Sequence, residues 1–169
     1  MILAVHIGNT NITIGAVKGT EIIFQARLRT DVTKTSDEYA IDLKMLLAIH
    51  SVAASEIEGA IIASVVPQVL NQIKTGLKKL FGKPILVVGP GIKTGLNIRI
   101  DNPAQTGSDL VVGCVAALKL RTPPLIVVGM GTATTLMVLD KNGAMIGGSI
   151  SPGVRISMEA LTERAALLP

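Results

Sequence analysis

The sequence opens with ILAVHIGNTNITIGAV at residues 2–17, where two short apolar runs flank a polar, glycine-containing turn. Residues 2–7 and 12–17 have the length and composition of buried strands, and residues 8–11 (Gly-Asn-Thr-Asn) have the composition of a tight turn. After a second short turn, residues 21–28 alternate well enough for a third strand. These segments predict an antiparallel meander at the start of the chain.

The same pattern returns after a break at residues 122–124 (Thr-Pro-Pro). The second set of predicted strands comprises residues 125–128, 133–139 and 144–150. A Gly-Met-Gly-Thr turn joins the first two of them, and Pro152 is expected to open a helix that runs to about residue 161. The repeat predicts two similar α/β lobes whose Gly-Thr turns face each other across a cleft.

Between the two meanders the predicted helices and strands alternate, as in an α/β protein. Ser36 is expected to cap the first helix, with Asp37 and Glu38 in the first turn, where carboxylates suit the helix dipole. The predicted elements of this region are helices at residues 36–50, 67–80 and 106–120 and strands at residues 60–65 and 85–88.

Composition argues against several classes of protein. Hydrophobic residues make up 49% of the chain and charged residues 17%, which excludes a disordered protein. Aromatic residues reach only 2%, too few for a module that stacks nucleic-acid bases or for a membrane aromatic belt. The net charge of +4 is small, and its densest group, Lys74, Lys78 and Lys79, is interpreted as a solvated helix face.

The sequence predicts a cytoplasmic protein that does not span a membrane. The mean hydropathy is +0.55, yet no apolar run reaches the roughly 18 residues that a bilayer span needs. The apolar start lacks the basic region of a signal peptide. Cys114 is the only cysteine, so no internal disulfide is possible, and its valine-rich surroundings predict a buried, inert thiol.

The two Gly-Thr turns are the first candidate sites. Backbone N–H groups in such a turn, together with a threonine hydroxyl, can cradle phosphate oxygens. The candidate nucleotide-binding residues are Gly8, Asn9, Thr10 and Asn11 in the first turn and Gly131 and Thr132 in the second. Either turn alone is also explained as an ordinary hairpin, but their occurrence at equivalent places in both meanders favours phosphate binding.

Other candidate residues are open to two interpretations. Asp109, which follows Gly107 and Ser108 at the start of a predicted helix, is either a carboxylate stabilised by the helix dipole or a general base. The small residues at 147–153 provide either close backbone packing or the floor beneath a ligand. His6 is interpreted as a satisfied core residue, and the histidines and cysteine are not spaced as a metal site.

Together these segments resemble the type III pantothenate kinases, a family of the acetate and sugar kinase, heat-shock chaperone and actin superfamily. The resemblance spans the whole chain, and so many motifs in the same order make it highly specific. The matching motifs are residues 7–11 (Ile-Gly-Asn-Thr-Asn), 35–39 (Thr-Ser-Asp-Glu-Tyr), 64–67 (Ser-Val-Val-Pro), 95–98 (Gly-Leu-Asn-Ile), 101–103 (Asp-Asn-Pro), 107–109 (Gly-Ser-Asp), 131–135 (Gly-Thr-Ala-Thr-Thr), 147–148 (Gly-Gly), 152–153 (Pro-Gly) and 164–169 (Arg-Ala-Ala-Leu-Leu-Pro).

The resemblance implies an α/β fold of duplicated, ribonuclease H-like (actin-like) lobes, with mixed sheets that contain an antiparallel meander and with helices. The N-terminal lobe is expected at residues 1–121 and the start of the second lobe at residues 122–169. Members of the family continue beyond this point, so the second lobe is expected to be incomplete. The family is usually dimeric, and a homodimer is expected here.

The resemblance also implies transfer of the γ-phosphoryl group of ATP to the primary hydroxyl of pantothenate, the first step towards coenzyme A. The cofactors would be Mg²⁺ and a monovalent cation, K⁺ or NH₄⁺. By match, the first turn would hold phosphates and Thr132 would contact ATP. Asp109 would be the catalytic base, and Gly107, Ser108 and Asp109 would bind pantothenate. No nucleic-acid or membrane partner is implied.

Four positions depart from the family pattern. His6 and Gly129 stand where the family has the aspartates that open the two Gly-Thr motifs, Ile100 replaces a tyrosine of the pantothenate site, and Leu110 replaces an arginine suited to a carboxylate. These replacements predict weak or absent turnover. The alternatives are a non-catalytic homologue that binds a nucleotide or a protein partner, and a fragment of a kinase.

Overall fold

The computed structural model describes residues 1–103 and 106–164, which form two compact units that divide between Pro90 and Gly91. Each unit is described by itself below. The lobe boundary was expected at residues 121–122, which assigned the helix at residues 108–120 to the first lobe. In the structure this helix belongs to the second compact unit. The division into lobes remains a prediction.

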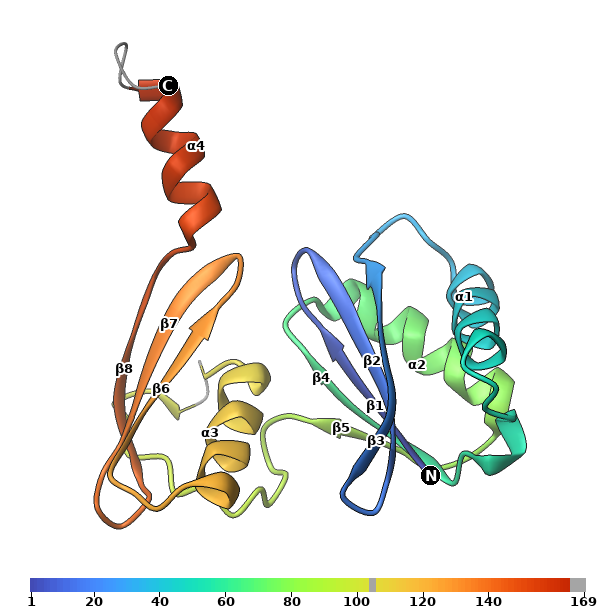
Figure 1. Cartoon of the computed structure of the whole chain (residues 1–169), viewed down its shortest axis with the longest axis horizontal. Coiled ribbons are helices and arrows are strands. Elements are labelled where there is room, and N and C mark those ends of the chain that lie inside the picture. The colour runs from blue at the N-terminus through green and yellow to red at the C-terminus, as the bar shows by residue number, and fades with distance from the viewer. Residues whose placement is uncertain (104–105, 165–169) are drawn as a thin grey trace. The chain divides into compact units, whose positions relative to one another are not determined.

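The first unit is a mixed sheet with helices on one face (Figure 1). Its strands lie in the order β3-β2-β1-β4-β5, with β1, β2 and β3 antiparallel and with β4 and β5 parallel to β1. The strands are β1 Ile2–Ile7, β2 Asn11–Lys18, β3 Glu21–Arg29, β4 Gly59–Ser64 and β5 Ile85–Val88, and the helices are α1 Ser36–Ile49, the short 3₁₀ helix Ala54–Glu56 and α2 Pro67–Phe81.

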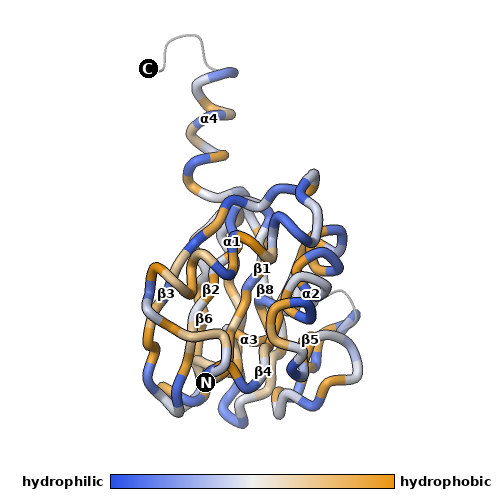
Figure 2. The backbone as a smooth tube through the Cα atoms, turned by 90° about the vertical axis from the view of Figure 1, so that its right-hand side faces the viewer, coloured by the Kyte–Doolittle hydropathy of each residue, from blue (hydrophilic) through white to orange (hydrophobic). Residues whose placement is uncertain are grey.

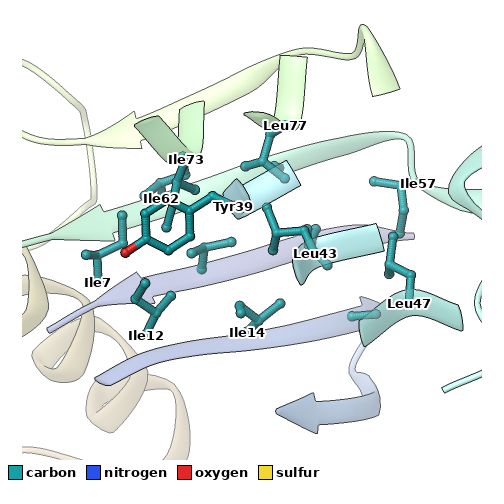
Figure 3. Close-up of a cluster of buried hydrophobic side chains, with 14 of the residues drawn as sticks. Ile7, Ile12, Ile14, Tyr39, Leu43, Leu47, Ile57, Ile62, Ile73 and Leu77 are labelled. Atoms are coloured by element: carbon teal, nitrogen blue, oxygen red, sulfur yellow. The ribbon is translucent and has the colours of Figure 1, made fainter. Parts of the chain in front are cut away.

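The core of this unit is almost entirely aliphatic. Leu3, Val5 and Ile7 alternate along β1 and are buried, because successive side chains of a strand point to opposite faces. Figure 3 shows how isoleucine and leucine side chains from the strands and helices meet around Tyr39. The Tyr39 hydroxyl donates to Asp31 O at 2.7 Å and accepts from Asp31 N at 3.0 Å, so its polar end is satisfied.

Helix α1 is capped by Thr35, so the expectation that Ser36 caps it was wrong. The hydroxyl of Thr35 accepts from the Glu38 N–H at 3.3 Å, and the Glu38 carboxylate accepts from the Thr35 N–H at 2.8 Å. This reciprocal arrangement needs threonine and glutamate three residues apart, a spacing that Thr35 satisfies and Ser36 does not. The hydrogen bonds that the Glu38 carboxylate accepts from Thr35 also hold the pKa of Glu38 below its usual value.

The second unit repeats the meander, as the sequence predicted, with a three-stranded antiparallel sheet in the order β6-β7-β8. Its elements are α3 Ser108–Leu120, β6 Leu125–Met130, β7 Ala133–Leu139, β8 Met145–Pro152 and α4 Val154–Arg164. Cys114 of α3 is fully buried against Met137, Leu139 and Met145. Burial raises the pKa of its thiol, in agreement with the prediction of an inert cysteine.

Two predicted boundaries in this unit were wrong. Pro152 ends β8, where it pairs with Ala133, and does not open the last helix; α4 begins at Val154. Helix α3 begins at Ser108, two residues later than expected, with Gly107 as its N-cap. Pro152 is tolerated in β8 because a proline at the end of an edge strand loses no hydrogen bond inside the sheet.

Helix α4 has a different environment from the other helices. None of its residues is buried, and hydrophobic and hydrophilic segments alternate along its tube (Figure 2). Among the described residues, no helix combines the length and the apolar character that crossing a bilayer requires.

Gly76 permits the close approach of α2 to α1, which gives a test of the packing. A Cβ at position 76 would lie 2.8 Å from Ser36 O and 3.3 Å from Ala40 N. We expect Gly76→Ala to destabilise the protein by about 1–3 kcal/mol, because backbone atoms must move to admit the methyl group. Urea denaturation monitored by circular dichroism measures the change.

The matched control is Gly113→Ala in α3, where a Cβ would meet nothing within 4 Å. This variant is expected to be neutral or to gain up to about 1 kcal/mol from the higher helix propensity of alanine. Equal unfolding midpoints for Gly76→Ala and the parent protein would contradict the packing described for α1 and α2.

Candidate functional site

The first Gly-Thr turn joins β1 to β2 and is fastened to the end of β3. Gly8 N–H donates to Asn11 O at 3.0 Å, which closes the turn. Thr30 donates from its hydroxyl to Gly8 O at 2.6 Å and from its N–H to Thr10 O at 3.0 Å. Asn9, Thr10 and Asn11 are exposed, so their polar groups lie at the surface. The hydrogen bonds from Thr30 therefore fix the backbone of the turn, while residues 9–11 remain accessible to a ligand.

His6 lies two residues before the turn glycine, on the face of β1 opposite Val5 and Ile7. Its side chain is partly buried, and its Nε2 atom is buried without a hydrogen-bond partner. The expectation of a satisfied core histidine was therefore wrong for this nitrogen. A buried polar atom that lacks a partner costs about 1–3 kcal/mol, so the histidine is not explained by stability alone.

The second turn occupies the equivalent place in the second unit. Gly129 also lies two residues before a turn glycine, and both it and His6 pair across the sheet with a threonine, Thr135 and Thr13 respectively. A Cβ at position 129 would lie 2.5 Å from the Thr135 hydroxyl oxygen. The Thr135 hydroxyl would therefore have to move to admit a side chain at position 129.

Gly153 packs directly on the second turn. Its N–H donates to Thr132 O at 3.0 Å, and a Cβ at this position would lie 2.6 Å from the same oxygen and still closer to Gly131 O. At Gly148 a Cβ would meet the Met137 side chain and lie 2.7 Å from Leu136 O. The interpretation of residues 147–153 as a closely packed joint is therefore correct for these two glycines.

A cavity of about 420 Å³ lies within the second unit, a size typical of small-molecule sites. It is lined by residues 99–102, Thr106, Leu110 of α3, Met137 of β7 and residues 145–148 and 150 of β8. Two of the four departures from the family pattern, positions 100 and 110, are in this lining. Gly147 and Gly148 also line it, and the interpretation of these residues as a floor beneath a ligand remains a prediction.

The polar groups of the cavity come from the loop before α3. Arg99, Asp101, Asn102 and Thr106 contribute to its lining, whereas the remaining lining residues are apolar or glycine. The Thr106 hydroxyl oxygen is buried and has no hydrogen-bond partner. A ligand that donates or accepts one hydrogen bond there would satisfy it.

Asp109 lies in the first turn of α3, between the cap residue Gly107 and the cavity-lining Leu110. The backbone N–H groups of Leu110 and Val111 donate to Gly107 O at 3.1 and 3.2 Å, which starts the helix. A carboxylate at this position is stabilised by the helix dipole. Gly107, Ser108 and Asp109 are not among the residues that line the cavity, and the wall on this side is formed by Thr106 and Leu110.

Sequence reasoning missed three features of these sites. Thr30 belongs to none of the motifs that were singled out, Thr106 was noted only as the expected start of a helix, and Met137 was noted only as a strand residue. One available signal was the position of Thr30 directly after the third strand of the first meander, β3. The expected motif at residues 164–169 lies, apart from Arg164, outside the described residues.

Solved structures with the same fold include kinases. The chain is similar to the ethanolamine utilization protein EutJ from Carboxydothermus hydrogenoformans, with 17% identity, a TM-score of 0.53 and coverage of 95% of this chain and 56% of that one. It is also similar to a candidate 2-dehydro-3-deoxygalactonokinase from Sinorhizobium meliloti, with 13% identity, a TM-score of 0.55 and coverage of 98% and 58%. At these identities the likeness shows the fold, and it confirms the predicted actin-like α/β class.

A third similar structure is a candidate N-acetylglucosamine kinase from Porphyromonas gingivalis, with 16% identity, a TM-score of 0.51 and coverage of 96% of this chain and 56% of that one. The chain thus spans a little more than half the length of these three proteins. A family model described as "Type III pantothenate kinase" matches residues 2–169.

The contact between Gly153 and the second turn can be tested by a single methyl group. Gly153→Ala places a Cβ against two carbonyl oxygens, so we expect a loss of about 1–3 kcal/mol in the free energy of unfolding. Gly147→Ala in β8 is the control, because a Cβ there meets nothing within 4 Å and the change should stay within about 0.5 kcal/mol. Chemical denaturation of both variants measures the difference, and equal losses would refute the contact.

Proposed function

Since the chain belongs to the type III pantothenate kinase family, we propose that it binds ATP at its Gly-Thr turns and pantothenate in the cavity beside α3. The reaction is transfer of the γ-phosphoryl group to the primary hydroxyl of pantothenate, the first step towards coenzyme A. The observation that carries this proposal is the cavity, because Asp101 and Asn102 of the motif at residues 101–103 line it, as do Thr106 and Leu110, which directly flank the motif at residues 107–109.

The proposed chemistry needs few protein groups. The pantothenate hydroxyl oxygen attacks the γ-phosphorus, its proton passes to the Asp109 carboxylate, and ADP leaves with the electrons of the broken P–O bond. A positioned carboxylate contributes about 10²–10⁴-fold to such a proton transfer. The rest of phosphoryl transfer is positioning and charge neutralisation, for which backbone N–H groups of the two turns are suitable.

We further propose that turnover is strongly impaired. Mg²⁺ prefers hard oxygen ligands, and the strand ends before the two turns offer His6 and Gly129 in place of carboxylates. In the cavity, Leu110 offers no guanidinium for the pantothenate carboxylate, and Ile100 removes an aromatic hydroxyl. A monovalent cation would likewise find no side-chain oxygen at Gly129.

The second candidate function is a non-catalytic homologue that binds a nucleotide. The contact between Thr135 and Gly129 favours it, because an aspartate at position 129 would require the Thr135 hydroxyl to move. Under this alternative the protein binds ligands but transfers no phosphoryl group.

A coupled assay of ADP release with ATP, Mg²⁺ and K⁺ tests the first proposal. We expect a pantothenate-dependent rate far below the roughly 1–100 s⁻¹ of ordinary kinases. His6→Asp is expected to raise the rate at least tenfold by restoring an oxygen ligand, and adding Asp109→Asn to this variant should remove the gain. Glu58→Gln is the control, since its exposed carboxylate pairs with the amino terminus at the start of β1, the end of that strand opposite the first turn, and belongs to none of the motifs.

Each outcome of this assay separates the alternatives. A pantothenate-dependent rate of ADP release in the range of ordinary kinases would contradict the proposal of impaired activity. Failure of His6→Asp to release ADP, together with measurable ATP binding in calorimetry, would favour the non-catalytic homologue. Absence of ATP binding at millimolar concentration would contradict both candidates.

We also propose that two copies of the chain associate through the second sheet. Ile126, Val128 and Met130 of β6 and Leu136 of β7 are exposed on the sheet face opposite Met137, with 40–77% of each side chain accessible. Apolar faces of this kind are usually covered by protein. Strand β6 also lies at the edge of its sheet, so one side of its backbone is not paired with another strand of the sheet, and such edges favour association with a second chain.

Light scattering after size-exclusion chromatography tests this association. We expect the parent protein to elute as a dimer and Val128→Lys to shift it towards the monomer, because a buried lysine without a partner is costly. Ile22→Lys, at an exposed apolar position of the first sheet, is the control and should leave the mass unchanged. A parent protein of monomeric mass would contradict the proposed dimer.

A further inference from the structure

The residues around the first turn do not fit a divalent cation. His6 supplies an imidazole in place of a carboxylate, and its Nε2 atom is buried without a partner. In the described part of the chain, no group of three or more His, Cys, Asp or Glu side chains is arranged to hold a metal ion. The position before this turn therefore lacks the carboxylate through which the magnesium ion that the family implies would be held, and another source of positive charge is needed beside the phosphate groups.

Positive charge lies beside this turn on the same face of the sheet. Arg27 of β3 pairs with Thr13 of β2, which pairs with His6 of β1, and directly paired residues point to the same face. Neighbouring strands are about 4.8 Å apart, so the Cα atoms of Arg27 and His6 are about 10 Å apart. Arg29 pairs with Asn11, the last residue of the turn, and shares the face of Arg27.

The turn and the arginine-bearing end of β3 are held together by Thr30. This residue directly follows Arg29 and donates hydrogen bonds to Gly8 O at 2.6 Å and to Thr10 O at 3.0 Å. The backbone of Arg29 is therefore fixed next to the turn. Both arginine side chains are exposed, so their guanidinium groups are accessible.

No carboxylate neutralises these two arginines at close range. Among residues 1–103 and 106–164, neither guanidinium lies within 4 Å of an acidic side chain. The adjacent acid, Asp31, accepts hydrogen bonds from the hydroxyl and N–H of Thr33, which lower its pKa, and the charge of Arg29 adds only a small effect. The planar, always-charged guanidinium is the side chain best suited to binding phosphate oxygens.

We propose that Arg27 and Arg29, with the backbone N–H of Asn9 in the turn beside them, form an anion site that binds the phosphate groups of a nucleotide without a divalent cation. The site deepens the proposed function, because it rests on a nucleotide that binds at the first turn. It differs in its chemistry: two guanidinium groups supply the positive charge that a metal ion bound through a carboxylate would supply. The preferred ligand is then the free polyphosphate anion and not its magnesium complex.

Calorimetric titration of ATP into the full chain, once with EDTA and once with excess Mg²⁺, tests this site. We expect binding in EDTA to be at least as tight as with Mg²⁺, since the metal cancels charge that the arginines would otherwise contact. Arg29→Gln should weaken binding in EDTA by about tenfold to a hundredfold, the range for a lost hydrogen bond to a charged group. Arg29→Lys, which keeps the charge, should recover part of the affinity.

The control variant is Lys18→Gln, which removes one exposed positive charge from the opposite end of β2 in the same sheet. It should bind ATP as the parent protein does. Inorganic pyrophosphate is the second probe, and it should also bind in EDTA and lose affinity in Arg29→Gln, because the site recognises phosphate groups. Circular dichroism confirms that each variant is folded.

The outcomes distinguish this inference from the function on which it rests. Binding of ATP that requires Mg²⁺, or that is equal in the parent protein and in Arg29→Gln, overturns the inference and leaves nucleotide binding intact. Failure of pyrophosphate to bind in EDTA also overturns it. Absence of ATP binding in both buffers overturns the proposed function and the inference together.

Discussion

The alternation of buried and accessible side chains along β1 is the constraint on which the first unit depends. Leu3, Val5 and Ile7 fill an aliphatic core that has few aromatic side chains to occupy large spaces. A shift of one residue in the register would move all three to the other face, so the register is strongly specified. It also places His6 on the face away from the core and starts the Gly8 turn directly after the strand. The position of the candidate phosphate site follows from core packing.

The second unit uses the same constraint with a different result. Leu125 and Val127 of β6 pack against the small core around Cys114, and alternation then assigns Gly129 to that same side. Thr135 has filled the space beside this glycine. The two turns thus occupy equivalent places in the two meanders, although neither His6 nor Gly129, which precede them, carries a carboxylate. Backbone geometry is preserved by packing, but the side chain that supplies charge can change without disturbing it.

Much of the fold could be predicted because local patterns and tertiary packing agree. The strand Ile2–Ile7, the repeated meander and the buried Cys114 all followed from periodicity and composition. The errors occurred where a choice between neighbouring residues depends on particular hydrogen bonds. Thr35 caps α1 because Glu38 lies three residues later, and Pro152 extends β8 because Ala133 lies opposite it.

For the candidate sites, the sequence by itself determined the two glycine turns and the Asp109 helix start. It also determined that positions 6 and 129 carry no carboxylate. All of these are properties of residue type and order. Only the tertiary structure decided that positions 100 and 110 line one cavity and that Thr30 fastens the first turn to β3. It also decided that Arg27 and Arg29 share a face with His6. The physical reason is that cross-strand register and loop closure join residues that are distant along the chain, and no local pattern records such pairs.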